Sequence, residues 1–88
     1  MRNIQWHAKA WESYLSLQED RNLLKRINRL LKDIQRNGYQ SSYGSPEMLK
    51  GNYSGYASVR VDSKNRLIFK VTDEDVIVIQ CGGHYNDK

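Results

Sequence analysis

The chain has 88 residues, 39% of them hydrophobic and 27% charged, and its 14 lysines and arginines against 10 acidic residues give a formal net charge of +4. A chain of this length has room for one core, so we expect a single domain over residues 1–88. One cysteine excludes an internal disulfide and a multi-thiolate metal site. No stretch approaches the roughly 20 apolar residues of a membrane span, and we expect no secretory signal, a cytoplasmic location and no membrane contact. The positive charge favours an anionic partner, either nucleic acid or an acidic protein.

The first half of the chain predicts one short strand and two helices. Ile4 and Trp6 alternate with polar neighbours, which indicates a strand over residues 3–6. Apolar residues at helical spacing then predict a first helix over about residues 7–17. Asp20 can cap a second helix and Gly38 can end it. Between them runs the clearest helical stripe of the chain: Leu23, Leu24, Ile27, Leu30, Leu31 and Ile34.

The polar side of the second helix carries a basic stripe. Its members recur at intervals of four, three and four residues, which places them on one side of a helix, opposite the leucines. They are Lys25, Arg29, Lys32 and Arg36. Two interpretations stay open: a solvated face that keeps the protein soluble, or a contact with a phosphate backbone or an acidic partner.

The second half of the chain predicts a long loop followed by three strands. Residues 38–55 are rich in glycine, serine and tyrosine and hold the only proline, and residues 46–50 within them look more ordered around Leu49. Strand patterns follow at residues 56–61 and 66–72 and in the run 75–85, which begins as a strand and ends at the His-Tyr pair, and the tight turns between them favour an antiparallel meander. Because nothing else can cover the apolar face, we expect an α+β fold with the two helices packed on one face of an antiparallel sheet.

Strand parity divides the side chains of these strands between the two faces of the sheet. We assign the aliphatic side of each strand to the helices, which in the last strand means Ile77, Ile79 and Cys81. We therefore expect Cys81 to be buried packing rather than a nucleophile. An open face is polar in any half-covered antiparallel sheet. Here it receives Arg60, Arg66, Lys70, Gln80 and His84.

These residue types can cleave RNA through its own 2′-hydroxyl. The loop is expected to bring Glu47 and Lys50 to an adjacent edge, and most of the tyrosines lie in this half of the chain, where they can stack on single-stranded bases. The reaction needs a base for the 2′-hydroxyl proton, arginines for the charge that builds on the phosphoryl oxygens, and an acid for the departing 5′-oxygen. Carboxylate, arginine and histidine can supply these roles, so we hypothesise a ribonuclease site on the open face.

Ordered sequence blocks support this hypothesis: PEMLKGNYSGY at residues 46–56, SVRVDSKNRLIFKV at 58–71 and CGGHY at 81–85, preceded by WESYL and KRINRLLKDI. Together they resemble the YoeB/Txe toxins, a branch of the RelE superfamily, over nearly the whole chain. The resemblance implies a RelE-like microbial ribonuclease fold. It also implies a bacterial type II toxin that cleaves mRNA, mainly in the ribosomal A site, and is neutralised by a YefM/Axe-like antitoxin. Relatives of this branch commonly form dimers, but the sequence does not reveal the oligomeric state of this chain.

The resemblance also implies a role for each site residue. Glu47 is then the general base and His84 the general acid. Arg66 stabilises the transition state, and Tyr85 orients or stacks the substrate. Further contacts to phosphate come from Lys50 and Arg60.

This sequence departs from the family pattern at several positions, among them Ala57 in place of a common aromatic residue and the extension of residues 86–88 past the usual terminal tyrosine. Val59 stands where the family has the first arginine of an S-R-R motif, and Gly82-Gly83 precede the His-Tyr pair in place of bulkier residues. There is no zinc-binding constellation and no glycine-rich phosphate loop, so we expect neither a metal nor a cofactor. The alternative function is a non-catalytic basic RNA-binding or antitoxin-binding module of the same fold.

Overall fold

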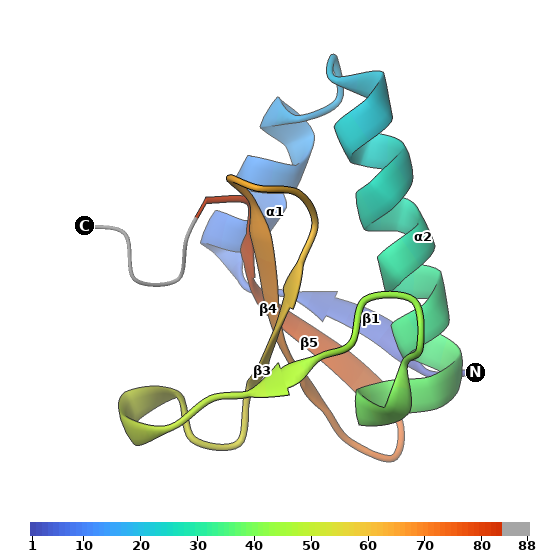
Figure 1. Ribbon diagram of the computed structural model, residues 1–88, viewed down its shortest axis with the longest axis vertical. Coiled ribbons are helices and arrows are strands. Elements are labelled where there is room, and N and C mark those ends of the chain that lie inside the picture. The colour runs from blue at the N-terminus through green and yellow to red at the C-terminus, as the bar shows by residue number, and fades with distance from the viewer. Residues whose placement is uncertain (84–88) are drawn as a thin grey trace.

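Two helices cover one face of a five-stranded sheet in the computed structural model, which describes residues 1–83 (Figure 1). The elements are β1 (Asn3–Trp6), α1 (Ala8–Ser16), α2 (Arg21–Asn37), β2 (Glu47–Met48), β3 (Ala57–Arg60), β4 (Arg66–Val71) and β5 (Asp75–Cys81). The strand order across the sheet is β1-β5-β4-β3-β2. The predicted α+β fold with both helices on one face is confirmed.

β1 makes the sheet mixed rather than purely antiparallel. It runs parallel to β5, with Asn3 opposite Asp75 and Trp6 opposite Val78. The pairs β5–β4, β4–β3 and β3–β2 are antiparallel, as the predicted meander requires. β1 therefore forms one edge of the sheet and β2 the other, so the short strand in the long loop lies beside β3.

The ends of both helices follow from capping residues. The His7 side chain accepts a hydrogen bond from the Lys9 N–H at the start of α1, and the Asp20 carboxylate accepts one from the Leu23 N–H at 3.1 Å at the start of α2. Gly38 ends α2 with a φ of 60°, which glycine adopts without strain. These ends agree with the predicted ones. Within residues 1–83, no helix combines the length and the apolar character that a membrane crossing needs.

The core lies between the helices and the sheet. α1 contributes Ala10, and α2 buries its predicted stripe apart from Leu24, which is half-buried. Burying a leucine, isoleucine or phenylalanine side chain contributes about 1.5–3 kcal/mol, so this stripe fixes α2 on the sheet. The sheet side of the core consists of Ala57, Val59, Val61, Leu67, Phe69, Val76, Val78 and Cys81.

The assignment of Ile77 and Ile79 to the core is wrong. Both are half-buried and lie outside the core cluster, whereas Val76 and Val78 are fully buried within it. The first part of β5 therefore presents to the helices the side that strand parity had given to the open face.

A β-bulge explains why the first part of β5 is reversed and why its last two residues are not. Phe69 of β4 pairs with Val78, but the neighbouring Ile68 pairs with Gln80, so Ile79 has no partner on β4. One extra residue inverts the alternation of side chains along the strand. After the bulge Gln80 points to the open face and the last residue of β5 points into the core, as the sequence predicted.

The loop between α2 and β3 is anchored against the core. Leu49 is buried, as expected, and Gly44 lies so close to two core side chains that any Cβ would collide with them. A Cβ at Gly44 would lie 2.2 Å from Cγ2 of Val59 and 2.5 Å from Cδ2 of Leu30. The loop is therefore fixed on both sides of β2, which holds Glu47 beside β3.

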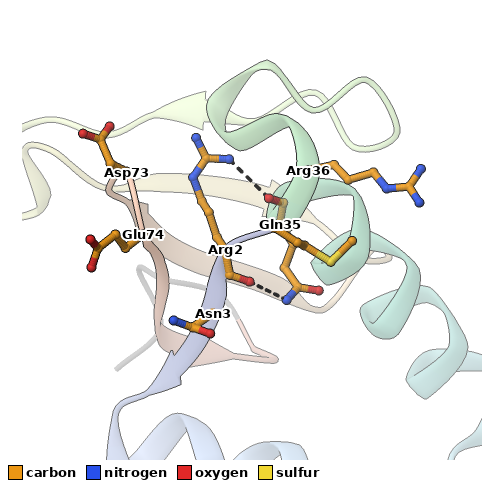
Figure 2. A pocket seen from close by; sticks show the side chains of 7 residues that line it. Arg2, Asn3, Gln35, Arg36, Asp73 and Glu74 are labelled. Carbon is orange, nitrogen blue, oxygen red and sulfur yellow. Dashed lines mark hydrogen bonds between the residues drawn. The ribbon is translucent and has the colours of Figure 1, made fainter.

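Arg2 ties the N-terminus to the end of α2 and to the turn between β4 and β5 (Figure 2). Its guanidinium donates from Nε to the Thr72 carbonyl at 2.8 Å and from Nη1 to the Gln35 carbonyl at 3.2 Å. The Gln35 side chain donates back to the Arg2 carbonyl at 2.7 Å. Asp73 and Glu74 line the same cavity, so charges of both signs meet there.

Candidate active site

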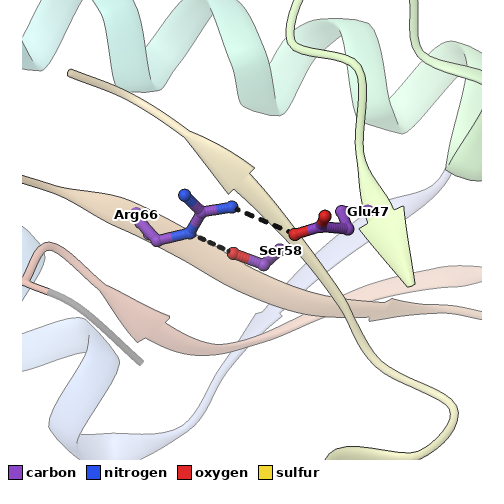
Figure 3. Close-up of polar contacts among 3 residues, drawn as sticks. All are labelled: Glu47, Ser58 and Arg66. Carbon is purple, nitrogen blue, oxygen red and sulfur yellow. Dashed lines mark hydrogen bonds and ion pairs between the residues drawn. The ribbon is translucent and has the colours of Figure 1, made fainter. Parts of the chain in front are cut away.

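β2, β3 and β4 bring three polar side chains together on the open face of the sheet (Figure 3). Glu47 in β2 pairs with Ser58 in β3, and Arg66, the first residue of β4, pairs with Arg60 in β3. Ser58 and Arg60 are two residues apart on one strand and so share a face. This is the face to which strand parity assigned the arginines.

Arg66 is held between Ser58 and Glu47. Its Nε donates to Ser58 Oγ at 2.6 Å, and its Nη2 lies 3.7 Å from Glu47 Oε1. The side chain of Arg66 is 19% exposed, that of Glu47 is 72% exposed, and Ser58 is fully buried. Because an exposed ion pair contributes little stability, the hydrogen bond that Arg66 donates to Ser58 is the main anchor of the guanidinium. The carboxylate remains open to a bound molecule.

Further cations lie on β3 and β4 and just beyond β2. Arg60 is exposed and lies opposite Arg66 with no ion pair of its own within residues 1–83. Lys50 is exposed just beyond β2, and its side chain makes no hydrogen bond or ion pair with the described part of the chain. Lys70, farther along β4, lies 5.8 Å from the centre of the Tyr56 ring. The open face therefore carries an excess of positive charge, which favours phosphate groups.

Asn65 holds the segment that follows β5. Its Oδ1 accepts a hydrogen bond from the Gly83 N–H at 2.9 Å. Arg66 bonds the same segment through its backbone, donating to the Gly83 carbonyl at 2.8 Å and accepting from the Gly82 N–H at 2.9 Å. Gly82 and Gly83 have φ values of 97° and 70°, which other residues rarely adopt. The two glycines that depart from the family pattern are therefore the residues that this turn requires.

Asp62 supports Asn65 from within the β3–β4 turn. Its Oδ1 accepts hydrogen bonds from the backbone N–H groups of Lys64 and Asn65, both at 2.8 Å, and from Asn65 Nδ2 at 3.0 Å. The hydrogen bond from the Lys64 N–H is the largest of the contributions that lower the pKa of Asp62 from its usual value. The turn thus presents the Asn65 amide with its oxygen toward the segment after β5.

The other predicted residues fall in three different places. His84 and Tyr85 lie outside the described residues. Cys81 is buried, and burial raises the pKa of its thiol to about 11, so it stays protonated and unreactive at neutral pH. Val59, at the position of the missing family arginine, is fully buried in the core, so this departure does not change the open face.

Tyr39 has a structural position. Its hydroxyl donates to the Gly55 carbonyl at 3.0 Å and accepts from the Val71 N–H at 2.8 Å, and its ring stacks on Phe69 at 6.0 Å between centroids. It joins the loop to β4 and is committed to packing. The expectation that tyrosines of this half grip RNA bases therefore does not extend to Tyr39.

Ser58 and Asn65 were not among the predicted site residues. The available signal was that Ser58 lies two residues before Arg60 and so shares its face of the strand, but a serine on a polar face is too common to stand out. Asn65 carried only a turn signal, because its contact with Gly83 joins residues 18 positions apart.

Comparison with known proteins agrees with this architecture. Residues 6–85 match the family described as the YoeB-like toxin of bacterial type II toxin–antitoxin systems. Toxin YoeB of Streptomyces coelicolor is 43% identical over 83 residues, which cover 93% of this chain and 98% of that protein. A chain of the YoeB–YefM complex from Staphylococcus aureus is 38% identical with a TM-score of 0.87, covering 97% of this chain and 99% of that one. A chain of the YoeB dimer from the same organism is 40% identical with a TM-score of 0.87, and the match covers 96% of this chain and 98% of that one.

Two helices on one face of a strand meander, together with these matches, define a toxin of the RelE-like α+β class. Within that class, the chain belongs to the YoeB-like toxins of bacterial type II toxin–antitoxin systems.

Proposed function

We propose that this toxin is an endoribonuclease that cleaves mRNA in the ribosomal A site by metal-independent acid–base transesterification. The observation that carries the proposal is the pair on the open face, where the Glu47 carboxylate lies 3.7 Å from the Arg66 guanidinium. A carboxylate among cations repels phosphate and so weakens RNA binding. Its presence there is explained if it has a chemical task. Proton abstraction from a ribose hydroxyl is such a task.

The proposed reaction assigns one step to each residue. Glu47 accepts the proton of the 2′-hydroxyl as that oxygen bonds to the adjacent phosphorus. Arg66, anchored by Ser58, stabilises the charge on the phosphoryl oxygens. The bond from phosphorus to the 5′-oxygen breaks, and His84 donates a proton to that oxygen. The products are a 2′,3′-cyclic phosphate and a 5′-hydroxyl.

The remaining residues of the proposed site bind rather than transfer protons. The guanidinium of Arg60 and the ammonium group of Lys50 are exposed, and both are proposed to contact phosphates on either side of the cleaved bond. Tyr85 is proposed to orient or stack the substrate. The cations of the site together offset the negative charge of an RNA strand that lies across the open face.

The partners follow from the relatives. The matched structures from Staphylococcus aureus are a YoeB–YefM complex and a YoeB dimer. We accordingly propose a YefM-like antitoxin and a second copy of this chain as protein partners, with the ribosome as the place of action.

The test compares mRNA on ribosomes with the same mRNA free in solution. Ribosomes stalled with an empty A site should yield a cut within the A-site codon, whereas free mRNA should be cut much more slowly. Overproduction in bacteria should stop growth, and coexpression of a YefM-like antitoxin should restore it. Intact mRNA together with harmless overproduction would favour the non-catalytic module instead.

A further inference from the structure

A second positively charged surface lies on α2, away from the sheet. Arg29, Lys32 and Arg36 of the basic stripe are exposed and line an open concavity of about 460 Å³, which the loop after α2 closes on one side with Ser42 and Tyr43. We call these three cations and the Tyr43 ring the α2 basic face. None of the three cations has an ion pair within residues 1–83.

Asp33 builds this surface by pinning the loop to the helix. Its carboxylate accepts hydrogen bonds from the Ser41 hydroxyl, from the Tyr43 N–H at 3.0 Å and from Asn37 Nδ2 at 2.6 Å. The Ser41 hydroxyl, followed by the Tyr43 N–H, lowers the pKa of Asp33 from its usual value. The carboxylate thus accepts hydrogen bonds from the chain itself. With three cations and one anion in the lining, the surface stays positively charged.

The pinned loop places an aromatic ring under one of the cations. The Arg29 guanidinium lies 4.2 Å from the centre of the Tyr43 ring. Stacking of this kind uses the flat face of the guanidinium and leaves the N–H donors on its edge free for an acceptor. Tyr43 is itself 43% exposed, so one side of the platform is open to a ligand.

The lining of the concavity indicates what kind of ligand fits. It consists of charged and polar side chains with one tyrosine and contains no aliphatic residue. A protein segment that binds in a groove needs apolar anchors, whereas a nucleic acid needs cations for phosphates and an aromatic face for a base. The cavity beside Arg2 shows the contrast, because Asp73 and Glu74 supply opposite charges there (Figure 2).

We infer that the α2 basic face is a second RNA-binding surface that contacts the phosphate backbone outside the cleavage site. The inference rests on the proposed function, because it assumes that one RNA contacts both this face and the cleavage site. Tyr43 and Glu47 are four residues apart, so their Cα atoms are at most about 14 Å apart. An RNA that passes around the β2 edge of the sheet can contact both surfaces.

The test measures binding separately from cleavage. A Glu47→Gln background keeps the RNA intact, and in it the triple variant Arg29→Gln, Lys32→Gln and Arg36→Gln is compared with a matched triple, Lys9→Gln, Arg21→Gln and Lys64→Gln. All six residues are exposed, so folding should be preserved in both variants. The probes are a single-stranded RNA oligonucleotide and bacterial ribosomes, which distinguish messenger from ribosomal RNA, and polyglutamate stands for an acidic protein.

Loss of three phosphate contacts should weaken binding about 100-fold at about 0.1 M salt and reduce the salt slope by about 2, because each contact contributes about 0.7 to the slope. Tyr43→Ala should weaken binding further than Tyr43→Phe. Equal RNA affinity of the two triples, or a loss confined to polyglutamate, would overturn the inference. Weakened binding by a chain that never cleaves RNA would leave the inference standing and refute the proposed function alone.

Discussion

Removing the Ser58 hydroxyl tests whether this buried residue positions Arg66 for catalysis. The hydroxyl is the one side-chain hydrogen-bond partner of the Arg66 guanidinium in the described part of the chain, at 2.6 Å from Nε. Ser58→Ala deletes this partner and leaves the charge in place. The variant therefore separates the position of the guanidinium from its presence.

The expected size of the effect follows from the environment of Arg66. A hydrogen bond to a charged group contributes about 1.5–3 kcal/mol, and about 1.4 kcal/mol corresponds to a tenfold change in rate. The Arg66 side chain is 19% exposed, so water can replace part of the lost bond. We therefore expect kcat to fall about tenfold and the free energy of unfolding to fall by about 1 kcal/mol. Arg66→Ala also removes the charge and should lower kcat by about 10²–10³.

The assay is a double-mutant cycle on single-turnover cleavage, with Ser63→Ala in the exposed β3–β4 turn as the control. If Ser58 acts through Arg66, adding Ser58→Ala to Arg66→Ala should slow cleavage no further. A tenfold loss that persists in the Arg66→Ala background would refute the positioning role.

Three further variants test other parts of the structure. Gly44→Ala should lower the free energy of unfolding by about 1–3 kcal/mol in urea titrations, because its Cβ meets packed core side chains, and an unchanged midpoint would contradict that packing. Asn65→Ala should slow cleavage up to about tenfold, because it removes the acceptor of the Gly83 N–H, while RNA affinity stays constant. An unaltered rate would show that the hydrogen bond between Asn65 and Gly83 does not support catalysis. The hydrogen bond from Ser41 depresses the pKa of Asp33, so its stabilisation is present above the unfolded value of about 3.9 and is lost as pH falls through the folded value. Urea titrations from neutral to acidic pH should accordingly show less acid destabilisation in Asp33→Asn than in wild type, and parallel curves would refute the assignment.

Much of the fold could be predicted because local signals and burial agreed. The α2 stripe, its Asp20 cap and its Gly38 end all point to the same helix, and the structure contains it. The partner of β1 could not be predicted, since a strand pattern of four residues carries no information about which strand it joins or in which direction. The reversal at Ile77 could not be predicted either. Residues 76–79 are all aliphatic, so the sequence does not show which side of the strand is buried or where a bulge occurs.

The charged residues of the candidate site could be predicted from the sequence, but the residues that hold them in place through hydrogen bonds could not. Glu47 and Arg66 stood out because a carboxylate and an arginine have distinct chemistry, and the β2–β3–β4 register brings them together. Ser58 and Asn65 act through hydrogen bonds that depend on strand register and turn geometry. Such contacts become visible only when the coordinates are known.

The central claim is that Glu47 on the open face is the base of an RNA transesterification, and mapping of RNA ends tests it most directly. Wild-type protein, Glu47→Gln, His84→Ala and the control Glu12→Gln, an exposed carboxylate on α1, are each incubated with RNA in EDTA at high protein concentration. We expect a 2′,3′-cyclic phosphate and a 5′-hydroxyl from wild type and Glu12→Gln, and loss of most cleavage in Glu47→Gln and His84→Ala. Products that carry a 5′-phosphate, or undiminished cleavage by Glu47→Gln, would contradict it.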